Sequence, residues 1–194
     1  MPETAAILDF WLKDVGPKGW YESSEALDDE IRQRFLPHWE QARRGAPDRG
    51  ACSAEGVLAY IILTDQFPRN MFREDPRAFA TDQLARRAAQ RAIHMRWDLR
   101  VAEPARQFFY LPLMHSEILA DQERCVRLVL TRMPETGAET LVHARAHRGI
   151  IRRFGRFPYR NAALGRSSTP EEEAFLAQGG YRAAVSALQA EAAE

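Results

Sequence analysis

The sequence has few cysteines and no long apolar run. Its two cysteines, Cys52 and Cys125, lie far apart without a close-spaced partner. A disulfide framework and a cysteine zinc site both need paired cysteines, so the sequence predicts neither. No apolar run reaches membrane-spanning length, and Met1–Thr4 lacks the basic start of a signal peptide. We therefore expect a cytoplasmic protein without a membrane anchor.

The sequence also has no net charge, because 27 basic side chains balance 27 acidic ones. A neutral chain has no overall field that attracts nucleic acid, so we expect no nucleic-acid partner. Its only lysines are Lys13 and Lys18, so nearly every positive charge is an arginine. Acidic residues are missing between Thr140 and Pro170, where positive charge is concentrated. The arginines of this acid-free stretch are Arg145, Arg148, Arg152, Arg153, Arg156, Arg160 and Arg166.

The hydrophobic pattern is typical of helices, and no segment shows the sustained period-two alternation of a strand. The fold class that we predict is all-α. The helices expected from spacing, caps and prolines cover 4–13, 24–45, 54–66, 77–95, 104–110, 112–132, 135–154, a helix from 170 onward, and 181–193. Phe67-Pro68 is expected to end one helix, and Gly155 another. A chain of 194 residues can form one domain or two small helical lobes, and we predict a single domain over 1–194.

Three runs carry a family resemblance. They are Ile61–Arg73, which contains Asp-Gln-Phe-Pro-Arg-Asn; Phe109–Glu117, which contains Leu-Pro-Leu-Met-His-Ser-Glu; and Arg153–Arg166, which begins Arg-Phe-Gly-Arg-Phe-Pro. Together they resemble a bacterial domain-of-unknown-function family over nearly the whole chain, from about Ile7 to Tyr181. The resemblance implies an all-helical, tetratricopeptide-like array of antiparallel helical hairpins. It implies no activity and no cofactor. The family usually has histidine where this chain has Tyr159, so we assign that position no catalytic role.

Arginine and asparagine side chains of the two Phe-Pro runs are the candidate ligand-binding residues. Guanidinium groups bind carboxylate or phosphate through two parallel hydrogen bonds, and the neighbouring aromatics can supply walls or cation–π contacts. The candidates are Arg69, Asn70, Arg153, Arg156, Arg160, Asn161 and Arg166. The alternative interpretation is structural: these arginines cap helices and pair with acids such as Asp65, Asp82, Glu117 and Asp121.

The catalytic candidates are His115, with Asp65 or Glu117 as its acid/base partner. Asp65 is expected on the apolar face of a helix, where a carboxylate needs a cation or several donors, and Arg69 is near. His115 and Glu117 are expected on the helix after Pro112. His143 and His147 have the spacing of a metal pair. Since Arg145 and Arg148 oppose a divalent cation, we predict no metal site.

Three hypotheses about function follow from these residues. The first is a binding module in which an arginine-lined groove takes an acidic small molecule or peptide. The second is a hydrolase or transferase acting on an anionic substrate. The third assigns the motifs a purely structural role. The sequence does not indicate the oligomeric state, and it predicts neither a cofactor nor a membrane partner.

Overall fold

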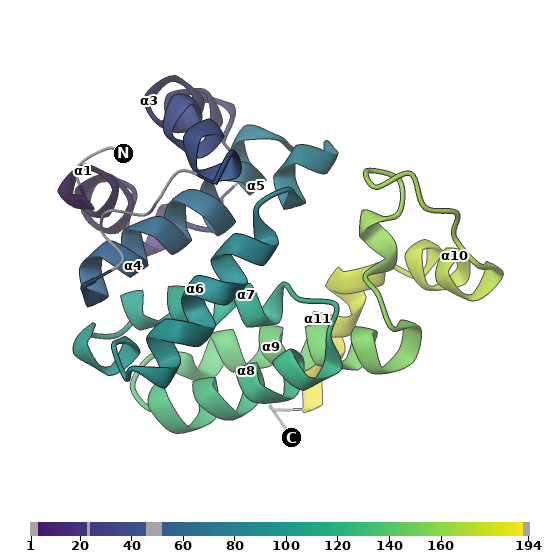
Figure 1. The fold of residues 1–194 in the computed structure, drawn as a ribbon. Helices are drawn as coiled ribbons and strands as arrows, with labels where there is room; N and C mark the ends of the chain where they lie inside the picture. The colour runs from purple at the N-terminus through teal and green to yellow at the C-terminus, as the bar shows by residue number, and fades with distance from the viewer. Residues whose placement is uncertain (1–3, 23, 46–51, 192–194) are drawn as a thin grey trace. The chain divides into compact units, whose positions relative to one another are not determined.

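The computed structural model describes residues 4–22, 24–45 and 52–191 (Figure 1). Every regular element in these ranges is a helix, which confirms the all-α prediction. The chain divides into two compact units, unit 1 (Met1–Pro112) and unit 2 (Leu113–Glu194). The single-domain assignment and the tetratricopeptide-like arrangement stay predictions. None of the described helices is long and apolar enough to cross a membrane.

Unit 1 is built from short helical segments around one long helix. Its elements are α1 (Thr4–Leu8), η1 (Asp9–Val15), α2 (Gly16–Gly19), α3 (Glu25–Arg43), α4 (Ala54–Ile61), η2 (Ile62–Gln66), α5 (Phe67–Met71), η3 (Pro76–Phe79), α6 (Asp82–His94), η4 (Asp98–Arg100) and η5 (Ala105–Phe109). A further turn, α7 (Leu111–Met114), contains the boundary between the units. The sequence over 43–53 is polar and contains glycine and proline, which predicts a loop, but residues 46–51 of it lie outside the described ranges.

The core of unit 1 forms around an apolar stripe of α3, which includes Ile31, Phe35 and Trp39. Ser24 caps this helix by accepting from the amide of Leu27, as its position before the apolar pattern indicates. Phe35 and Trp39 are almost fully buried on the stripe. The ring of Phe35 lies 4.7 Å from that of Phe67, a close aromatic contact that joins α3 to α5. The helix also runs through Pro37 without interruption.

The prediction that Phe67-Pro68 ends a helix is wrong. The backbone instead widens into the π-helical turn η2 and continues as α5, with Pro68 in the first turn of α5. Proline has no N–H to donate to the carbonyl four residues earlier, which is that of Thr64. The hydroxyl of Thr81 donates to this carbonyl at 2.6 Å. The Thr81 side chain, from another segment, thus satisfies the Thr64 carbonyl, which lacks an amide donor at Pro68.

The helix expected over 77–95 is in fact two helices. Asp75 caps the start by accepting from the amide of Arg77, but the 3-10 turn η3 ends at Phe79. Helix α6 begins only at Asp82. Between them, Thr81 bonds to Trp39 and to Thr64, and these buried hydrogen bonds hold the chain out of a continuous helix.

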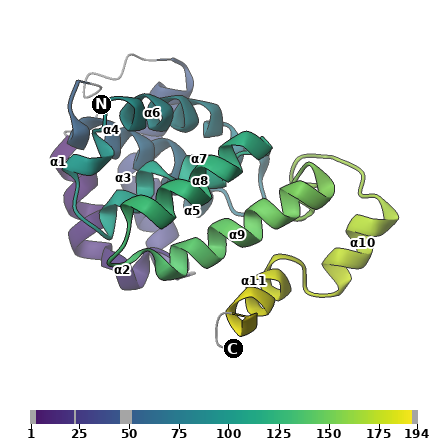
Figure 2. The ribbon, with the colours of Figure 1, turned by 90° about the horizontal axis from the view of Figure 1, so that it is seen from below.

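Unit 2 is a helical hairpin with a smaller C-terminal pair of helices. Its elements are α8 (Leu119–Arg132), α9 (Gly137–Phe154), η6 (Pro158–Arg160), α10 (Pro170–Ala177) and α11 (Gly180–Glu191). Helix α9 packs against both α8 and α11 (Figure 1, Figure 2). Gly155 ends α9 with φ of 69°, and the Thr169-Pro170-Glu171-Glu172 run, whose sequence predicts a helix start, forms a capping box at the start of α10. These two signals predicted the helix boundaries correctly.

The expected helix over 112–132 is interrupted, so the prediction that His115 and Glu117 lie on a helix is wrong. Helix α7 ends at Met114 and α8 begins at Leu119. The fully buried Gln122 side chain donates to the carbonyls of Met114 and Ser116, both at 2.6 Å. Because these carbonyls accept from a side chain, they need no amide donors from a following helical turn. The interruption places His115 and Glu117 in a connecting segment.

Candidate functional site

In unit 1, the first Phe-Pro run places Asp65 and Arg69 next to each other. Asp65 is fully buried, and Gln66 Nε2 donates to its carboxylate at 2.5 Å. Arg69 Nη1 lies 3.3 Å from the same carboxylate and donates to the backbone carbonyl of Asp65 at 2.6 Å. Both Nη atoms of Arg69 bind Asp82, at 2.9 and 3.0 Å. Arg69 is therefore the cation that a buried Asp65 needs, and it joins η2 to α6.

Asn70 binds a different acid, Asp28 of α3. Asn70 Nδ2 donates to Asp28 Oδ1 at 2.9 Å, and Arg73 donates to both carboxylate oxygens of the same residue. Asp28 is buried, with 6% of its surface exposed. These hydrogen bonds tie the end of α5 to the first turn of α3. Sequence reasoning did not identify Asp28 and Arg73 as site residues. A carboxylate at a buried helix position needs a cation or hydrogen-bond donors, so the position of Asp28 could have indicated this site.

A cavity of about 410 Å³ opens beside Asn70 and Arg73. It is contained in unit 1, between the start of α3 and the segment that follows α5. Its charged lining comprises Glu25, Asp28, Asp29 and Asp75 together with Arg32, Arg73 and Arg77. Arg32 also donates to the carbonyl of Met71 at 2.9 Å. The cavity therefore brings residues of three segments around one space, with charges of both signs.

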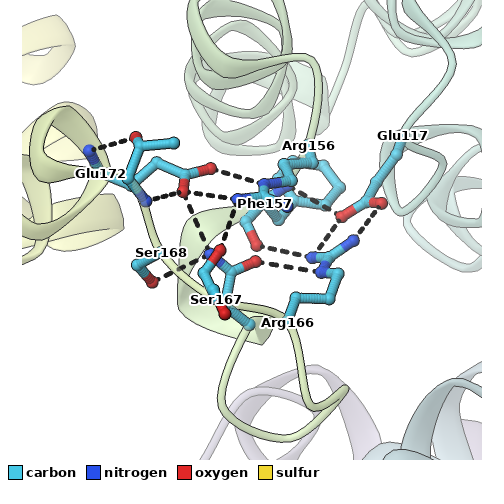
Figure 3. A network of polar contacts seen from close by, with 9 residues as sticks. Glu117, Arg156, Phe157, Arg166, Ser167, Ser168 and Glu172 are labelled. Atoms are coloured by element: carbon cyan, nitrogen blue, oxygen red, sulfur yellow. Dashed lines mark hydrogen bonds and ion pairs between the residues drawn. The ribbon is translucent and has the colours of Figure 1, made fainter.

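In unit 2, the second Phe-Pro run is organised around Glu172 of α10 (Figure 3). Arg156 binds both carboxylate oxygens of Glu172 at 2.6 and 2.7 Å, and Asn161 and the amide of Thr169 donate to the same group. The hydrogen bonds from Arg156 and Thr169 lower the pKa of Glu172 to about 2. Arg156 also donates to the carbonyl of Ser167. This carboxylate stays ionised and connects the turn after α9 to the start of α10.

Glu117 anchors the same turn from the other end of the network (Figure 3). Arg166 donates to its two oxygens at 2.7 and 3.0 Å, and the amide of Phe157 donates at 2.8 Å. Burial favours the neutral form of Glu117, but the bonds from Arg166 and Phe157 outweigh it and lower its pKa. Arg166 also donates to Asn161 at 3.0 Å. The arrangement fixes the turn through charged hydrogen bonds that are all internal to unit 2.

The other two predicted arginines have different surroundings. Arg153 is exposed and pairs with Glu171 at 2.9 Å. Arg160 is buried, with 7% of its surface exposed, and its guanidinium carbon lies 4.5 Å from the centre of the Phe157 ring. An exposed pair such as the first contributes little stability, whereas a buried guanidinium over an aromatic face is a specific cation–π contact.

The structure thus joins some predicted site residues and separates others. Arg156, Asn161 and Arg166 lie in one network in unit 2, while Arg69 and Asn70 bind separate acids in unit 1. Arg69, Arg153, Arg156 and Arg166 each have a carboxylate partner in their own unit. These pairs have the geometry that the structural interpretation of the motifs describes.

The catalytic candidates lie in different units. Asp65 is in unit 1, and its carboxylate is enclosed there with Gln66 and Arg69. His115 and Glu117 are in unit 2, where Glu117 is held by Arg166. A carboxylate with a lowered pKa is a poor proton donor at neutral pH. The role of His115 with Asp65 or Glu117 stays a prediction.

An imidazole cluster is formed by His143 and His147, which sequence reasoning considered as a metal pair, and by the catalytic candidate His115. His143 Nδ1 lies 2.5 Å from the hydroxyl of Tyr181, and the His147 ring is 4.6 Å from the Tyr181 ring. His115 and His147 have ring centres 6.2 Å apart. Within the described ranges, no group of three or more His, Cys, Asp or Glu side chains is placed to hold a metal ion.

The helices and the polar networks define an all-helical protein in which arginine–carboxylate pairs fix the turns that follow α5 and α9. The chain belongs to the family described as bacterial protein of unknown function (DUF924), which matches residues 7–180. This result confirms the family resemblance of the three sequence runs.

A solved structure supports the same assignment. The chain is 43% identical to a protein of unknown function from Agrobacterium tumefaciens, ATU0120, with a TM-score of 0.82. The similarity covers 89% of this chain and 96% of that one. A comparison with curated proteins gave no significant match.

Proposed function

We propose that the protein is a binding module whose ligand is the carboxylate end of an amino acid or short peptide, held in the cavity of unit 1. The observation that carries this proposal is the cavity of about 410 Å³ with guanidinium groups of Arg32, Arg73 and Arg77 in its lining. Such a volume suits a small molecule. Guanidinium groups bind carboxylates through paired, charged hydrogen bonds.

Two of these arginines, Arg73 and Arg77, differ in how readily they can bind a ligand. Arg73 is committed to the buried Asp28, which also accepts from Asn70. Arg77 pairs with Asp75 two residues away, and 57% of its side chain is exposed. An exposed local pair of this kind contributes little stability, so a ligand carboxylate can replace it at small cost. Arg73 therefore maintains the shape of the site, and Arg77 is the ligand-binding arginine.

The acids in the lining restrict the ligand further. Glu25 and Asp29 are exposed and belong to the same cavity. They repel a second negative charge and attract an ammonium group. A ligand with one carboxylate and a neutral or positive remainder satisfies both sets of charges. An amino acid or the end of a peptide has this composition.

Alanyl-alanine and its C-terminal amide are matched probes for the site. The dipeptide is expected to raise the melting temperature as its concentration increases, because a ligand that binds the folded state stabilises it by mass action. The amide lacks the carboxylate and is expected to cause no rise. Equal stabilisation by both probes, or by neither, contradicts the proposal.

A pair of variants locates the binding in the cavity. Arg77→Met is expected to weaken dipeptide binding about tenfold or more, the usual effect of losing a charged hydrogen bond. Arg44→Met is the control, because Arg44 is also exposed and pairs locally with Glu40, but it lies beyond the other end of α3. Calorimetric titration of the two variants should separate them, and unchanged binding by Arg77→Met rejects the site.

A further inference from the structure

The charges that line the cavity of unit 1 do not balance. Its described lining has four acidic and three basic side chains. Each of these arginines pairs with one of the acids, and the pairs are Arg32–Asp29, Arg73–Asp28 and Arg77–Asp75. The acid outside these pairs is Glu25. The cavity therefore carries one excess negative charge, and that charge is on Glu25.

Glu25 lies in the first turn of α3, where its carboxylate is accessible to a ligand. Ser24 caps the helix just before it, and negative charge is favourable at this end of a helix. The side chain of Glu25 is exposed, and in the described part of the chain no ion pair joins it to a cation. Asp28 follows three residues later on the same face of the helix and is buried. Glu25 thus lies at the mouth of the cavity, and Asp28 lies deeper.

Binding of a carboxylate at Arg77 increases this excess of negative charge. The guanidinium of Arg77 donates to both carboxylate oxygens of Asp75, at 3.0 and 2.9 Å. A ligand carboxylate that takes these donors leaves Asp75 with the backbone amide of Arg77, which donates to it at 2.8 Å. Asp75 then keeps a hydrogen-bond donor, but its charge is no longer paired. An ammonium group on the same ligand compensates the added negative charge, and a neutral group does not.

We propose that Glu25 is the specificity-determining residue of this site and that it binds the main-chain ammonium group of the ligand. This inference rests on the proposed function, in which Arg77 binds the ligand carboxylate. Because Glu25 and Arg77 line the same cavity, both charged ends of the ligand lie within it. The ligand is then a free amino acid or a short peptide with an unmodified amino end. The carboxyl end of a longer chain does not meet this requirement, because its amino end lies outside the cavity.

Alanyl-alanine and N-acetyl-alanyl-alanine are matched probes for the role of Glu25. The two peptides share the carboxylate and differ in the charge at the amino end. We expect the acetylated peptide to bind about tenfold more weakly or worse, because it loses the charged hydrogen bond to Glu25. Calorimetric titration of the parent protein with each peptide measures this preference.

The outcomes separate this inference from the proposed function. Equal affinity for the two peptides, or tighter binding of the acetylated one, overturns the role of Glu25 and leaves the proposed carboxylate binding intact. Absence of binding by both peptides overturns the two proposals together.

The variant Glu25→Gln separates the charge of the amino end from its size. Acetylation also adds bulk, and a preference that arises from bulk persists in this variant. We expect Glu25→Gln to bind alanyl-alanine about tenfold more weakly than the parent does, and to bind the two peptides within about twofold of each other. Glu55→Gln is the control, because Glu55 is an exposed acid in the first turn of α4, which Ser53 caps in the same way. It should keep the preference of the parent, and a preference that persists in Glu25→Gln overturns the inference.

Reversal of the charge at Glu25 gives a second test with variants. Glu25→Lys places an ammonium group where the ligand ammonium is expected to bind, so the two groups repel each other. We expect this variant to bind the acetylated peptide more tightly than alanyl-alanine, which is the reverse of the order in the parent. Glu55→Lys should keep the order of the parent. If Glu25→Lys still binds alanyl-alanine more tightly, the inference is overturned.

Discussion

Thr81 provides the sharpest stability prediction, because its one hydroxyl satisfies two buried groups. The side chain is fully buried between η3 and α6. Its Oγ1 donates to the carbonyl of Thr64 at 2.6 Å and accepts from Trp39 Nε1 at 3.0 Å. The Thr64 carbonyl lies four residues before Pro68, which cannot donate to it. The hydroxyl therefore supports both α3 and the π-helical turn that leads into α5.

The substitution Thr81→Val keeps the shape of the side chain and removes the hydroxyl. The indole N–H of Trp39 and the carbonyl of Thr64 then lose this partner in a buried environment. Each buried polar group left without a partner costs about 1–3 kcal/mol. The added methyl group recovers part of this, so we expect a loss of about 2–4 kcal/mol in the free energy of unfolding. For a chain of this size, that corresponds to a decrease of roughly 4–15 °C in melting temperature.

A double-mutant cycle tests the assigned reason for the loss. Pro68→Ala restores an N–H that can donate to the Thr64 carbonyl. Its effect on the free energy of unfolding should therefore be about 1 kcal/mol more favourable in the Thr81→Val background than in the parent protein. Urea unfolding followed by circular dichroism gives the four free energies. Thr131→Val is the control, because that hydroxyl is exposed and bonds only within α8, to Arg127; its effect should be within about 0.5 kcal/mol. A similarly small effect of Thr81→Val, or strict additivity of the cycle, refutes the reasoning.

Two further predictions concern unit 2. Since burial lowers the pKa of His147 to about 3 in the folded protein against 6.5 as the ordinary value, the unfolded chain takes up the proton first as the pH falls. The free energy of unfolding should therefore be retained above about pH 6.5 and fall by about 2 kcal/mol by about pH 5. Urea titrations at several pH values measure this dependence, and His147→Phe should flatten it. Gly155→Ala should destabilise by about 1 kcal/mol, because Gly155 has φ of 69°. Gly149→Ala, within α9 and with open space around the added carbon, should instead stabilise by about 0.5–1 kcal/mol in thermal melts; the opposite order of the two glycine variants contradicts this account.

The sequence predicted helix boundaries correctly where adjacent residues determine them. Gly155 ends α9 and Thr169 caps α10 because a left-handed residue and a capping box act within one turn of the chain. Phe67-Pro68 misled the prediction because the compensating donor, Thr81, comes from a segment further along the chain. The segment at His115 misled it because Gln122 satisfies the carbonyls that a longer helix would have used.

The candidate sites were less accessible to sequence reasoning than the helices. Asn70 and the arginine runs were identified from composition, but their partners Asp28 and Glu172 depend on contacts across helices. The cavity in unit 1 arises where α3 meets the segment after α5, and no local pattern marks it. The spacing of His143 and His147 is that of a metal pair, whereas in the structure His147 Nδ1 lies against the carbonyl oxygen of His143 and the ring packs against Phe157 and Tyr181.

By itself, the sequence determined the all-α class, the family, and the helix ends that depend on nearby residues. Hydrophobic period, capping and glycine conformation are properties of a few adjacent residues, so they can be identified before the chain is folded. The tertiary structure decided which carboxylate each arginine meets, where the chain avoids a continuous helix, and where a cavity opens. Those outcomes depend on satisfying buried polar groups with donors from distant segments, and only the folded chain brings such segments together.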